Sequence, residues 1–281
     1  TPSAESTLAG SDSADASAAA VPTEITKVIS LAPATTQIIE ALGMKDKLVA
    51  VDTQSPLYVE GVSQLPQFDM MAPNIEQIAL LEPDVVFTSG MSYLDDNPFQ
   101  ALIDMGICVI EIPSSNSIQA VKEDIVYTAA CLGKEAEGQA IVDKMQVTID
   151  SIAAIGATIT EKKTVLFEIA CLPYIYSFGD GTFLDEMIEL IGAENVLGDQ
   201  TSWLSVTEES AVAANPDVIL TNVNYIDDPI GEILARTGWE NVTAGAGLIA
   251  FQRTGLAGSS AQDHKYLYIF PAFGAFDLCQ L

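Results

Sequence analysis

The stretch PNIEQIALLEPDVVFTS (73–89) decides the fold, because a helix, a turn and a buried strand follow one another within it. Its first part, 73–83, carries apolar residues at helical spacing, and Pro83 then favours a turn. The run DVVFTS (84–89) is short and mainly apolar, which is typical of a strand buried on both faces of a parallel sheet. The stretch therefore predicts one helix-to-strand unit of an α/β fold.

An echo of this unit occurs in the second half of the chain. Glu76 precedes Pro83 by seven residues, and Pro83 opens PDVVFTS. Glu209 likewise precedes Pro216 by seven residues, and Pro216 opens PDVILTN. Both halves thus have a glutamate at the same distance before a similar strand sequence, which predicts two related lobes.

Strands and helices alternate on both sides of the two units. The first half predicts strands at 28–33, 48–52, 84–89 and 107–113, and helices at 35–44, 73–83 and 97–106. The second half predicts a strand at 163–170, a helix at 180–196, a strand at 217–222 and a helix at 228–238. Alternation of this kind predicts βαβ units and parallel-rich sheets.

Two long helical segments, 117–133 and 135–156, separate the halves. In the second, apolar residues from Ile141 to Ile152 fall along one face. Such a helix extends roughly 33 Å at 1.5 Å per residue, enough to bridge two lobes. The predicted organisation is a disordered tether (1–22), an N-terminal α/β lobe (23–133), a connecting helix (134–157) and a C-terminal α/β lobe (158–281).

Composition excludes several classes of function. The 281 residues include 39 acidic and 11 basic side chains, a formal net charge of −28, which repels a phosphate backbone and excludes nucleic-acid binding. The same charge argues against a dedicated binder of highly anionic ligands and keeps the protein soluble. No apolar run is long enough to span a bilayer.

Cysteine and histidine usage argues against a metal site and against catalysis. Cys108, Cys131, Cys171 and Cys279 show no C-x-x-C spacing, so buried free thiols are expected and a disulfide stays open. The single histidine, His264, cannot supply a His-rich zinc or manganese site. It also lies in an atypical segment for a Ser-His-Asp arrangement, so neither a catalytic residue nor a metal ligand is expected.

Five separated motifs, covering about residues 25–244, resemble one family. They resemble the vitamin B12- and iron-chelate-binding substrate-binding proteins of ABC importers, the class III periplasmic binding proteins. The motifs are VISLAPATTQIIEALG (28–43), PNIEQIALLEPDVVFTS (73–89), the long central helix, GAENVLGDQTSWLSVTEESAVAANPDVILTN (192–222) and TGWENVTA (237–244).

The resemblance implies a function without chemistry. Two α/β lobes joined by a rigid helix hold a ligand in the cleft between them, and a glutamate on each lobe docks onto arginines of a permease dimer. Glu76 and Glu209 stand at those positions. The resemblance further implies a monomeric, extracytoplasmic protein that contacts the membrane only through an N-terminal lipid anchor, or that is free in the periplasm.

The C-terminal segment departs from the family pattern. After TGWENVTA the family continues with a strand, a loop and a final helix, whereas 245–281 is aromatic-rich and has poor helical periodicity. We hypothesise that the reading frame is altered near residue 244, which sequencing of the gene would test.

A cleft for a large chelate requires apolar and aromatic walls, and loops after parallel strands are where α/β sheets place ligands. Trp203 matches an aromatic cleft position of the B12-binding members. The predicted wall residues are Tyr58, Phe68, Met70, Tyr93 and Phe99 in the first lobe, and Tyr174, Tyr176, Phe178, Trp203 and Tyr225 in the second.

Three ligand classes compete for this cleft. Ferric siderophores are often anionic, and no basic residue lies in the candidate loops. Haem would require an axial ligand such as Tyr58, Met70, Tyr93 or Tyr176. A corrinoid, whose metal is already ligated and whose side chains are neutral amides, requires only stacking surface and hydrogen bonds. We favour a corrinoid, with haem and siderophores as alternatives.

Two other classes of function stay open. A tetrapyrrole chelatase would need a histidine to accept pyrrole protons, and the chain offers only His264. A surface protein that binds a protein partner is the other alternative. No cofactor is expected beyond the transported ligand.

Overall fold

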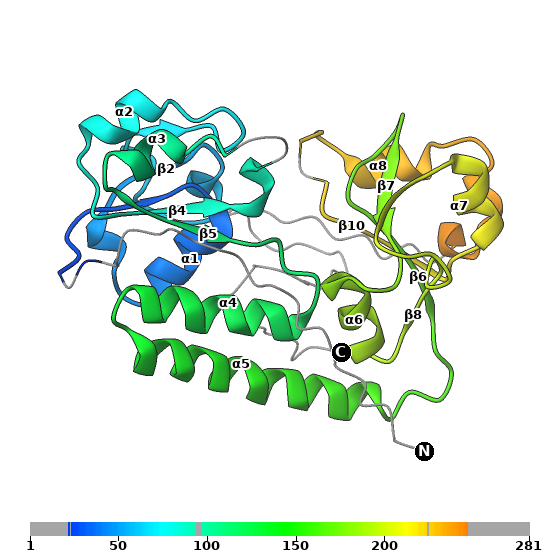
Figure 1. The fold of residues 1–281 in the computed structure, drawn as a ribbon. Helices are drawn as coiled ribbons and strands as arrows, with labels where there is room; N and C mark the ends of the chain where they lie inside the picture. Colours follow the sequence, from blue (N-terminus) through cyan, green and yellow to red (C-terminus); the bar gives the residue numbers. More distant parts are fainter. Residues whose placement is uncertain (1–21, 23, 94–96, 224, 247–281) are drawn as a thin grey trace, which may run out of the picture.

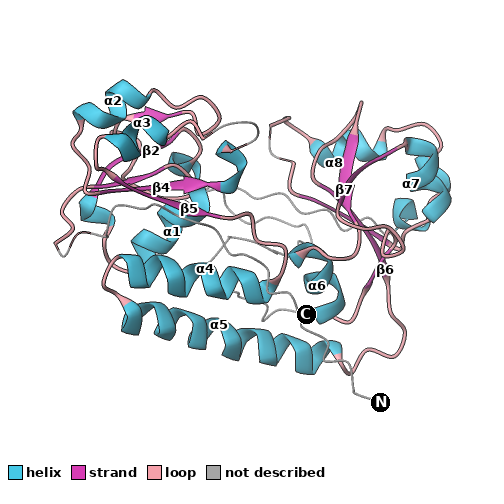
Figure 2. Ribbon diagram, viewed as in Figure 1, coloured by secondary structure: helices cyan, strands magenta, loops and turns pink. Residues whose placement is uncertain are grey.

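The computed structural model describes residues 22, 24–93, 97–223 and 225–246, which form two lobes side by side (Figure 1). The N lobe is built on strands β1 to β5 and the C lobe on strands β6 to β10. Two long helices lie beneath the N lobe, and one of them reaches the C lobe (Figures 1 and 2). The predicted two-lobed α/β fold is confirmed, whereas the C-terminal residues 247–281 lie outside the described part of the chain.

The N-lobe sheet has the order β3-β2-β1-β4-β5, and all its neighbouring strands are parallel. The prediction of a parallel sheet from alternating strands and helices is therefore correct in this lobe. The strands are β1 (Val28–Ser30), β2 (Leu48–Asp52), β3 (Gln67–Phe68), β4 (Val85–Ser89) and β5 (Cys108–Ile112).

Helices cover both faces of this sheet because successive residues of a strand point to opposite sides. Val28 and Phe87 face the layer of α1 (Pro33–Ala41) and α4 (Ile118–Cys131). Ile29 and Val86 face the layer of α2 (Ile75–Leu80) and α3 (Gln100–Asp104). Burial on both faces explains why these strands read as continuous apolar runs.

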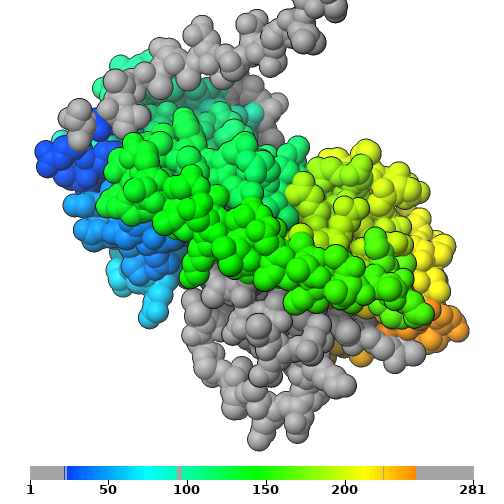
Figure 3. Space-filling model, turned by 90° about the horizontal axis from the view of Figure 1, so that it is seen from below, coloured from blue at the N-terminus to red at the C-terminus, as the bar shows by residue number. Residues whose placement is uncertain are grey.

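The helix that connects the lobes is α5 (Glu135–Gly156), which confirms the helix predicted at 135–156. It packs along α4, and seen from below the two helices extend from the N lobe toward the C lobe (Figure 3). Close packing begins at Gly138, where an added Cβ would clash with the Cβ of Ala129. Ile149 and Ile152 of α5 are buried, as the predicted apolar face requires.

At the junction between α5 and the C lobe, the backbone of α5 packs directly against the backbone at the end of α6. A Cβ added at Gly156 would clash with the carbonyl oxygen of Leu190, at the end of α6 (Phe183–Leu190), and would lie 2.9 Å from the amide nitrogen of Gly192. A second contact joins α6 to α4, because the carboxylate of Glu186 accepts a hydrogen bond of 2.6 Å from the backbone N–H of Ile118. The C lobe is therefore anchored to the helix layer at two points of α6.

The C lobe contains two sheets, a parallel one as predicted and an antiparallel pair that was not predicted. A parallel sheet of order β10-β6-β8 comprises β6 (Thr164–Glu168), β8 (Glu194–Asn195) and β10 (Val218–Thr221). An antiparallel pair joins β7 (Ile175–Phe178) to β9 (Trp203–Val206). The helix predicted at 180–196 is too long, since α6 ends at Leu190 and β8 follows. The remaining helices are α7 (Glu208–Ala214) and α8 (Pro229–Leu234).

The sequence echo is also a structural repeat. Asn74 caps α2 by accepting a hydrogen bond from the backbone of the third helical residue, and Thr207 caps α7 in the same way. Glu76 and Glu209 are each the second residue of their helix. The two halves thus present a glutamate on the first turn of equivalent helices.

The turn after each of these helices repeats as well. Glu82 (φ 50°) and Asn215 (φ 46°), which precede the two prolines, both have left-handed backbone conformations. The aspartate after each proline then ties the turn to the start of the neighbouring strand. Asp84 accepts hydrogen bonds from the backbone N–H groups of Thr26 (2.7 Å) and Lys27 (2.9 Å), as Asp217 accepts from the backbone of Thr164 (3.0 Å). The sequence PDV, at 83–85 and again at 216–218, therefore forms the same helix-to-strand turn in both lobes.

Candidate ligand-binding site between the lobes

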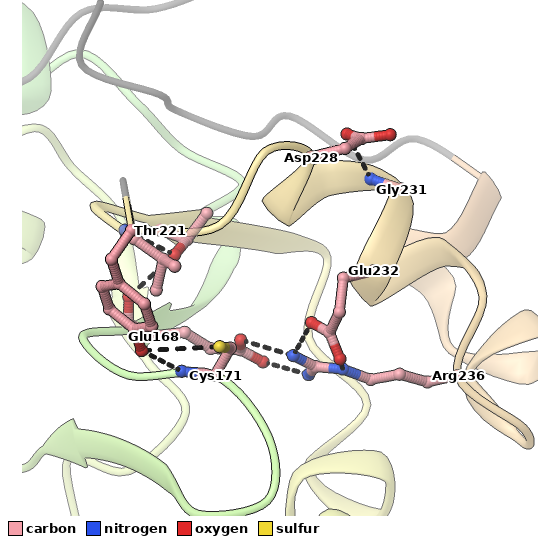
Figure 4. A network of polar contacts seen from close by, with 9 residues as sticks. Glu168, Cys171, Thr221, Asp228, Gly231, Glu232 and Arg236 are labelled. Carbon is pink, nitrogen blue, oxygen red and sulfur yellow. Dashed lines mark hydrogen bonds and ion pairs between the residues drawn. The ribbon is translucent and has the colours of Figure 1, made fainter.

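The C-lobe edge of the site begins where β6 and β10 end. Cys171 follows β6, and Tyr225 follows β10. The Tyr225 hydroxyl oxygen accepts a hydrogen bond of 3.2 Å from the Cys171 backbone N–H and lies 3.4 Å from its sulfur, as the dashed lines beside Cys171 mark (Figure 4). This hydrogen bond to the thiol raises the pKa of Tyr225, and burial adds to the shift. Tyr225 is nonetheless 64% exposed, so its ring is available to a ligand.

The antiparallel pair β7–β9 adds three exposed aromatic rings to the same lobe. Trp203, at the start of β9, makes edge contacts with Phe178 (5.9 Å between ring centroids) and Phe183 (6.2 Å), and it keeps 39% of its surface exposed. Tyr176 on β7 is equally exposed, and Tyr174, just before β7, is 79% exposed. Trp203 is thus held by two neighbouring rings, whereas Tyr174 and Tyr176 add further exposed aromatic surface to the lobe.

The N-lobe edge combines one tyrosine with thioethers. Tyr93 follows β4, and its hydroxyl lies 2.9 Å from the hydroxyl of Thr88, while its ring packs 5.6 Å from that of Phe99. Burial raises the pKa of Tyr93, so its phenol stays protonated at neutral pH. Met70 follows β3 and is half-buried. Met71 and Met91, which the sequence analysis missed, are exposed beside these residues in the chain.

Three predicted wall residues are core residues instead. Phe68 lies within β3 and is 6% exposed, and Phe178 lies within β7 and is fully buried. Phe99 precedes α3 and is also fully buried. Their rings fill the cores on the sheet faces, so they do not belong to the site. Tyr58 follows β2 on a half-buried turn and packs against the core beneath α1.

A buried polar chain, also missed, fixes the loops after β1 and β2. The carboxylate of Asp52 accepts hydrogen bonds from the Ser55 hydroxyl and from the backbone N–H of Ser55 (3.0 Å). The Ser55 hydroxyl lies 2.7 Å from that of Thr36, which lies 2.8 Å from that of Ser30. These small polar residues have no distinctive sequence spacing, so only the fold brings them together.

A buried ionic triad underlies the C-lobe edge (Figure 4). Arg236 forms a two-bond ion pair with Glu168 (2.5 and 3.0 Å) and a second with Glu232 (2.5 and 3.0 Å). Its guanidinium carbon also lies 4.7 Å from the centroid of the Trp239 ring. Burial raises the pKa of Glu168, although Arg236 acts in the opposite direction. This triad was not predicted from the sequence. The i,i+4 spacing of Glu232 and Arg236 along a predicted helix could have indicated one of its pairs, but nothing in the sequence points to the partner Glu168 on β6.

The residues predicted to dock a permease are exposed on both lobes. Glu76 and Glu209 are surface residues at the capped ends of α2 and α7. Both helices lie on the side of the molecule away from α5 (Figure 1). Among the described residues, no group of three His, Cys, Asp or Glu side chains is arranged to hold a metal ion. The described part of the chain likewise contains no helix that combines the length and apolar character needed to cross a bilayer.

Two lobes of parallel-rich sheet, bridged by one helix and edged with aromatic residues, define a class of binding protein. The chain belongs to the periplasmic binding protein family, whose sequence profile matches residues 28–247. This family is a transport class that binds substrates without transforming them. Its members in ABC importers deliver small molecules to a permease.

Particular relatives narrow the comparison. The chain is 33% identical over 222 residues to the uncharacterized ABC transporter substrate-binding lipoprotein YvrC of Bacillus subtilis (strain 168), covering 78% of this chain and 69% of that protein. It is 27% identical over 200 residues to a vitamin B12-binding protein of Yersinia pestis (strain Pestoides F), covering 70% and 69%. The crystal structure of the periplasmic heme-binding protein HutB of Vibrio cholerae matches with a TM-score of 0.71 and 26% identity, over 81% of this chain and 90% of that chain.

Proposed function

We propose that this protein captures a corrinoid between its lobes and delivers it to the permease of an ABC importer. The observation that carries the proposal is the group of exposed aromatic rings at the C-lobe edge, namely Tyr174, Tyr176, Trp203 and Tyr225. Such rings offer stacking surface to a macrocycle whose metal is already ligated. The likeness to a vitamin B12-binding protein supports the same ligand.

Capture requires burial of apolar surface and no bond chemistry. Burial contributes about 25 cal/mol for each Å² of apolar surface removed from water. The loss of translational and rotational freedom on association opposes this gain. Because α6 is anchored to α4 and α5, the lobes need little rearrangement to meet the ligand, which limits the ordering cost.

Haem is the second candidate, and a specific observation favours it. Tyr93 on the N lobe and Tyr176 or Tyr225 on the C lobe are phenols of the kind that ligate haem iron. Met70 offers a thioether on the N lobe. The structural likeness to a heme-binding protein supports this alternative. A ferric siderophore remains the third candidate.

The ligand is tested by equilibrium binding. Cyanocobalamin, haemin and a ferric siderophore are titrated separately against the wild-type protein, with visible absorption and melting temperature as readouts. The expected result is micromolar or tighter binding of cyanocobalamin and a rise of several degrees in melting temperature. Binding of haemin with a shifted Soret band, and none of cyanocobalamin, would replace the corrinoid by haem.

Trp203 supplies the variant for this test. Trp203→Ala should weaken corrinoid binding about fivefold or more, since one stacked ring contributes about 1 kcal/mol or more. Tyr127→Ala is the matched control, because Tyr127 is a half-exposed ring on α4, remote from the C-lobe edge. Equal affinities of the two variants would remove Trp203 from the site.

Delivery is proposed to use Glu76 and Glu209 as the two permease contacts, with one protein molecule docking onto a permease dimer. Their matched positions on two capped helices support this role. The relative named as a lipoprotein supports an extracytoplasmic protein held at the membrane by an N-terminal lipid. Replacing both glutamates by glutamine should abolish transport in a reconstituted importer and leave corrinoid affinity unchanged. Undiminished transport would refute the docking role.

A further inference from the structure

No described lysine lies at the carboxyl ends of the strands, and the one described arginine near these ends is already paired with carboxylates. In a parallel sheet these ends form the edge where ligands bind, opposite the amino ends. Every described lysine lies before a strand or on the connecting helix layer. Those before β1, β2 and β6 are Lys27, Lys45, Lys47, Lys162 and Lys163, and those on or beside α4 and α5 are Lys122, Lys134 and Lys144.

Arg236 is the one described arginine, and its charge is already satisfied. Four of its N–H donors point at the carboxylates of Glu168 and Glu232, and its side chain is only 1% exposed. Two carboxylates around one guanidinium leave an excess of one negative charge. Glu168 is fully buried, so water screens this charge weakly. The triad therefore repels an anionic group at the C-lobe edge rather than attracting it.

On each lobe, the charge of a nearby carboxylate contributes to a raised pKa of a tyrosine at the edge of the site. On the N lobe, burial raises the pKa of Tyr93 and the charge of Glu111 on β5 raises it further. On the C lobe, the hydrogen bond with Cys171 raises the pKa of Tyr225, and the charge of Glu168 adds to that shift. Glu111 and Glu168 are thus the carboxylates whose charges act on the tyrosines of the two lobes.

We propose that the site between the lobes selects chelates whose net charge is zero or positive, and that the Glu168–Arg236–Glu232 triad enforces this selection. The inference rests on the proposed capture of a metal chelate and specifies the charge of that chelate. A neutral periphery of amides satisfies the rule, as does an ammonium group. A chelate that carries ionised carboxylates or an uncompensated catecholate charge does not satisfy it.

The first test uses ligands that differ in charge and hardly in shape. Cyanocobalamin is neutral, its monocarboxylic acid carries one negative charge after hydrolysis of one peripheral amide, and the methyl ester of that acid is neutral again. The wild-type protein should bind the acid about tenfold more weakly than cyanocobalamin, which corresponds to about 1.4 kcal/mol, and should bind the ester nearly as well as cyanocobalamin. Equal affinity for all three overturns the inference.

A second series makes the test independent of the corrinoid. Ferrioxamine B carries a free ammonium, its N-acetyl form is neutral, and its N-succinyl form is anionic. If the cobalamins do not bind and the ferrioxamines bind in the order cationic, neutral, anionic, the corrinoid proposal fails while the charge rule stands. If the neutral and cationic ligands of both series fail to bind, the charge rule is overturned.

The role of the triad is tested by Glu232→Gln. Glu232 is the partly exposed member, at 28%, so its replacement removes one charge without leaving a buried cation unpaired. The penalty on the anionic ligand should fall from about tenfold to about threefold. Glu135→Gln is the matched control, because Glu135 is an exposed carboxylate at the remote start of α5. If the anionic ligand is penalised equally in Glu232→Gln and Glu135→Gln, the role of the triad is overturned. The comparison of ligands with the wild-type protein does not depend on the folding of any variant.

Discussion

Glu82 offers a direct test of the repeat, because it holds a left-handed backbone conformation (φ 50°) that a glutamate adopts at a cost. For a residue with a Cβ this conformation is unfavourable by about 1 kcal/mol or more, and asparagine tolerates it better. Asn215, at the equivalent position of the second unit, shows that the repeat accommodates asparagine. Glu82→Asn should therefore relieve strain in the N lobe.

The expected magnitude follows from two opposing terms. Relief of strain should contribute about 0.5–1 kcal/mol. The ion pair of Glu82 with Lys27 is lost, but its atoms are 3.6 Å apart and its carboxylate is 85% exposed, so the loss is at most about 0.5 kcal/mol. Glu82→Gln removes the ion pair and keeps the strain. Asparagine should consequently be more stable than glutamine at this position by about 0.5–1 kcal/mol.

The assay is urea unfolding followed by two signals. Both tryptophans, Trp203 and Trp239, lie in the C lobe, so their fluorescence follows that lobe while far-ultraviolet circular dichroism follows both. Glu82→Asn should raise the midpoint seen by circular dichroism. The reciprocal change, Asn215→Glu, should lower the fluorescence midpoint, because it adds strain and removes the acceptor of the 2.9 Å hydrogen bond from Thr243. If asparagine and glutamine at position 82 are equally stable, the reasoning about strain is refuted.

Two further predictions concern the junction and the pH dependence. Gly156→Ala should destabilise the protein by about 1–3 kcal/mol in urea unfolding, because the added methyl group overpacks the backbone of Leu190, and an unchanged midpoint would contradict that contact. Asp84→Asn should cost about 1 kcal/mol at pH 7. Hydrogen bonds from two backbone N–H groups lower the pKa of Asp84, so its contribution is present above the ordinary value of 3.8 and is lost as pH falls through the lower folded value. Melting temperatures measured between pH 7 and pH 2 should thus converge for wild type and variant at the acid end, and parallel curves would argue against the shift.

The parallel part of the fold could be predicted because strands buried on both faces of a sheet consist of consecutive apolar residues. The predicted strand 48–52 coincides with β2, and the predicted helix 135–156 coincides with α5. Helix ends were less well predicted, since α6 ends at Leu190, shortly before the left-handed Gly192, inside an otherwise helical pattern. The repeat was visible because both lobes use the same helix-to-strand turn.

The antiparallel pair β7–β9 could not be predicted from its residues. It is short, and it pairs Ile175 with Val206, far along the chain, so no local pattern announces it. The same limit applies to the site. A sequence shows that Phe178 and Trp203 are aromatic but not that one ring is buried beneath the other, which only the pairing of β7 with β9 decides.

The two contacts of α6 determine what kind of motion the molecule allows. Within the described residues, the chain crosses from the helix layer to the C lobe once, through residues 157–163. A body tethered by a single segment could swivel about it. The contact of Gly156 with the end of α6, together with the hydrogen bond from Ile118 to Glu186, provides two separated points of attachment that remove this rotation. The distance between Glu76 and Glu209 is therefore set by packed helices and not by a flexible linker. A partner that contacts both glutamates would meet them at a fixed separation.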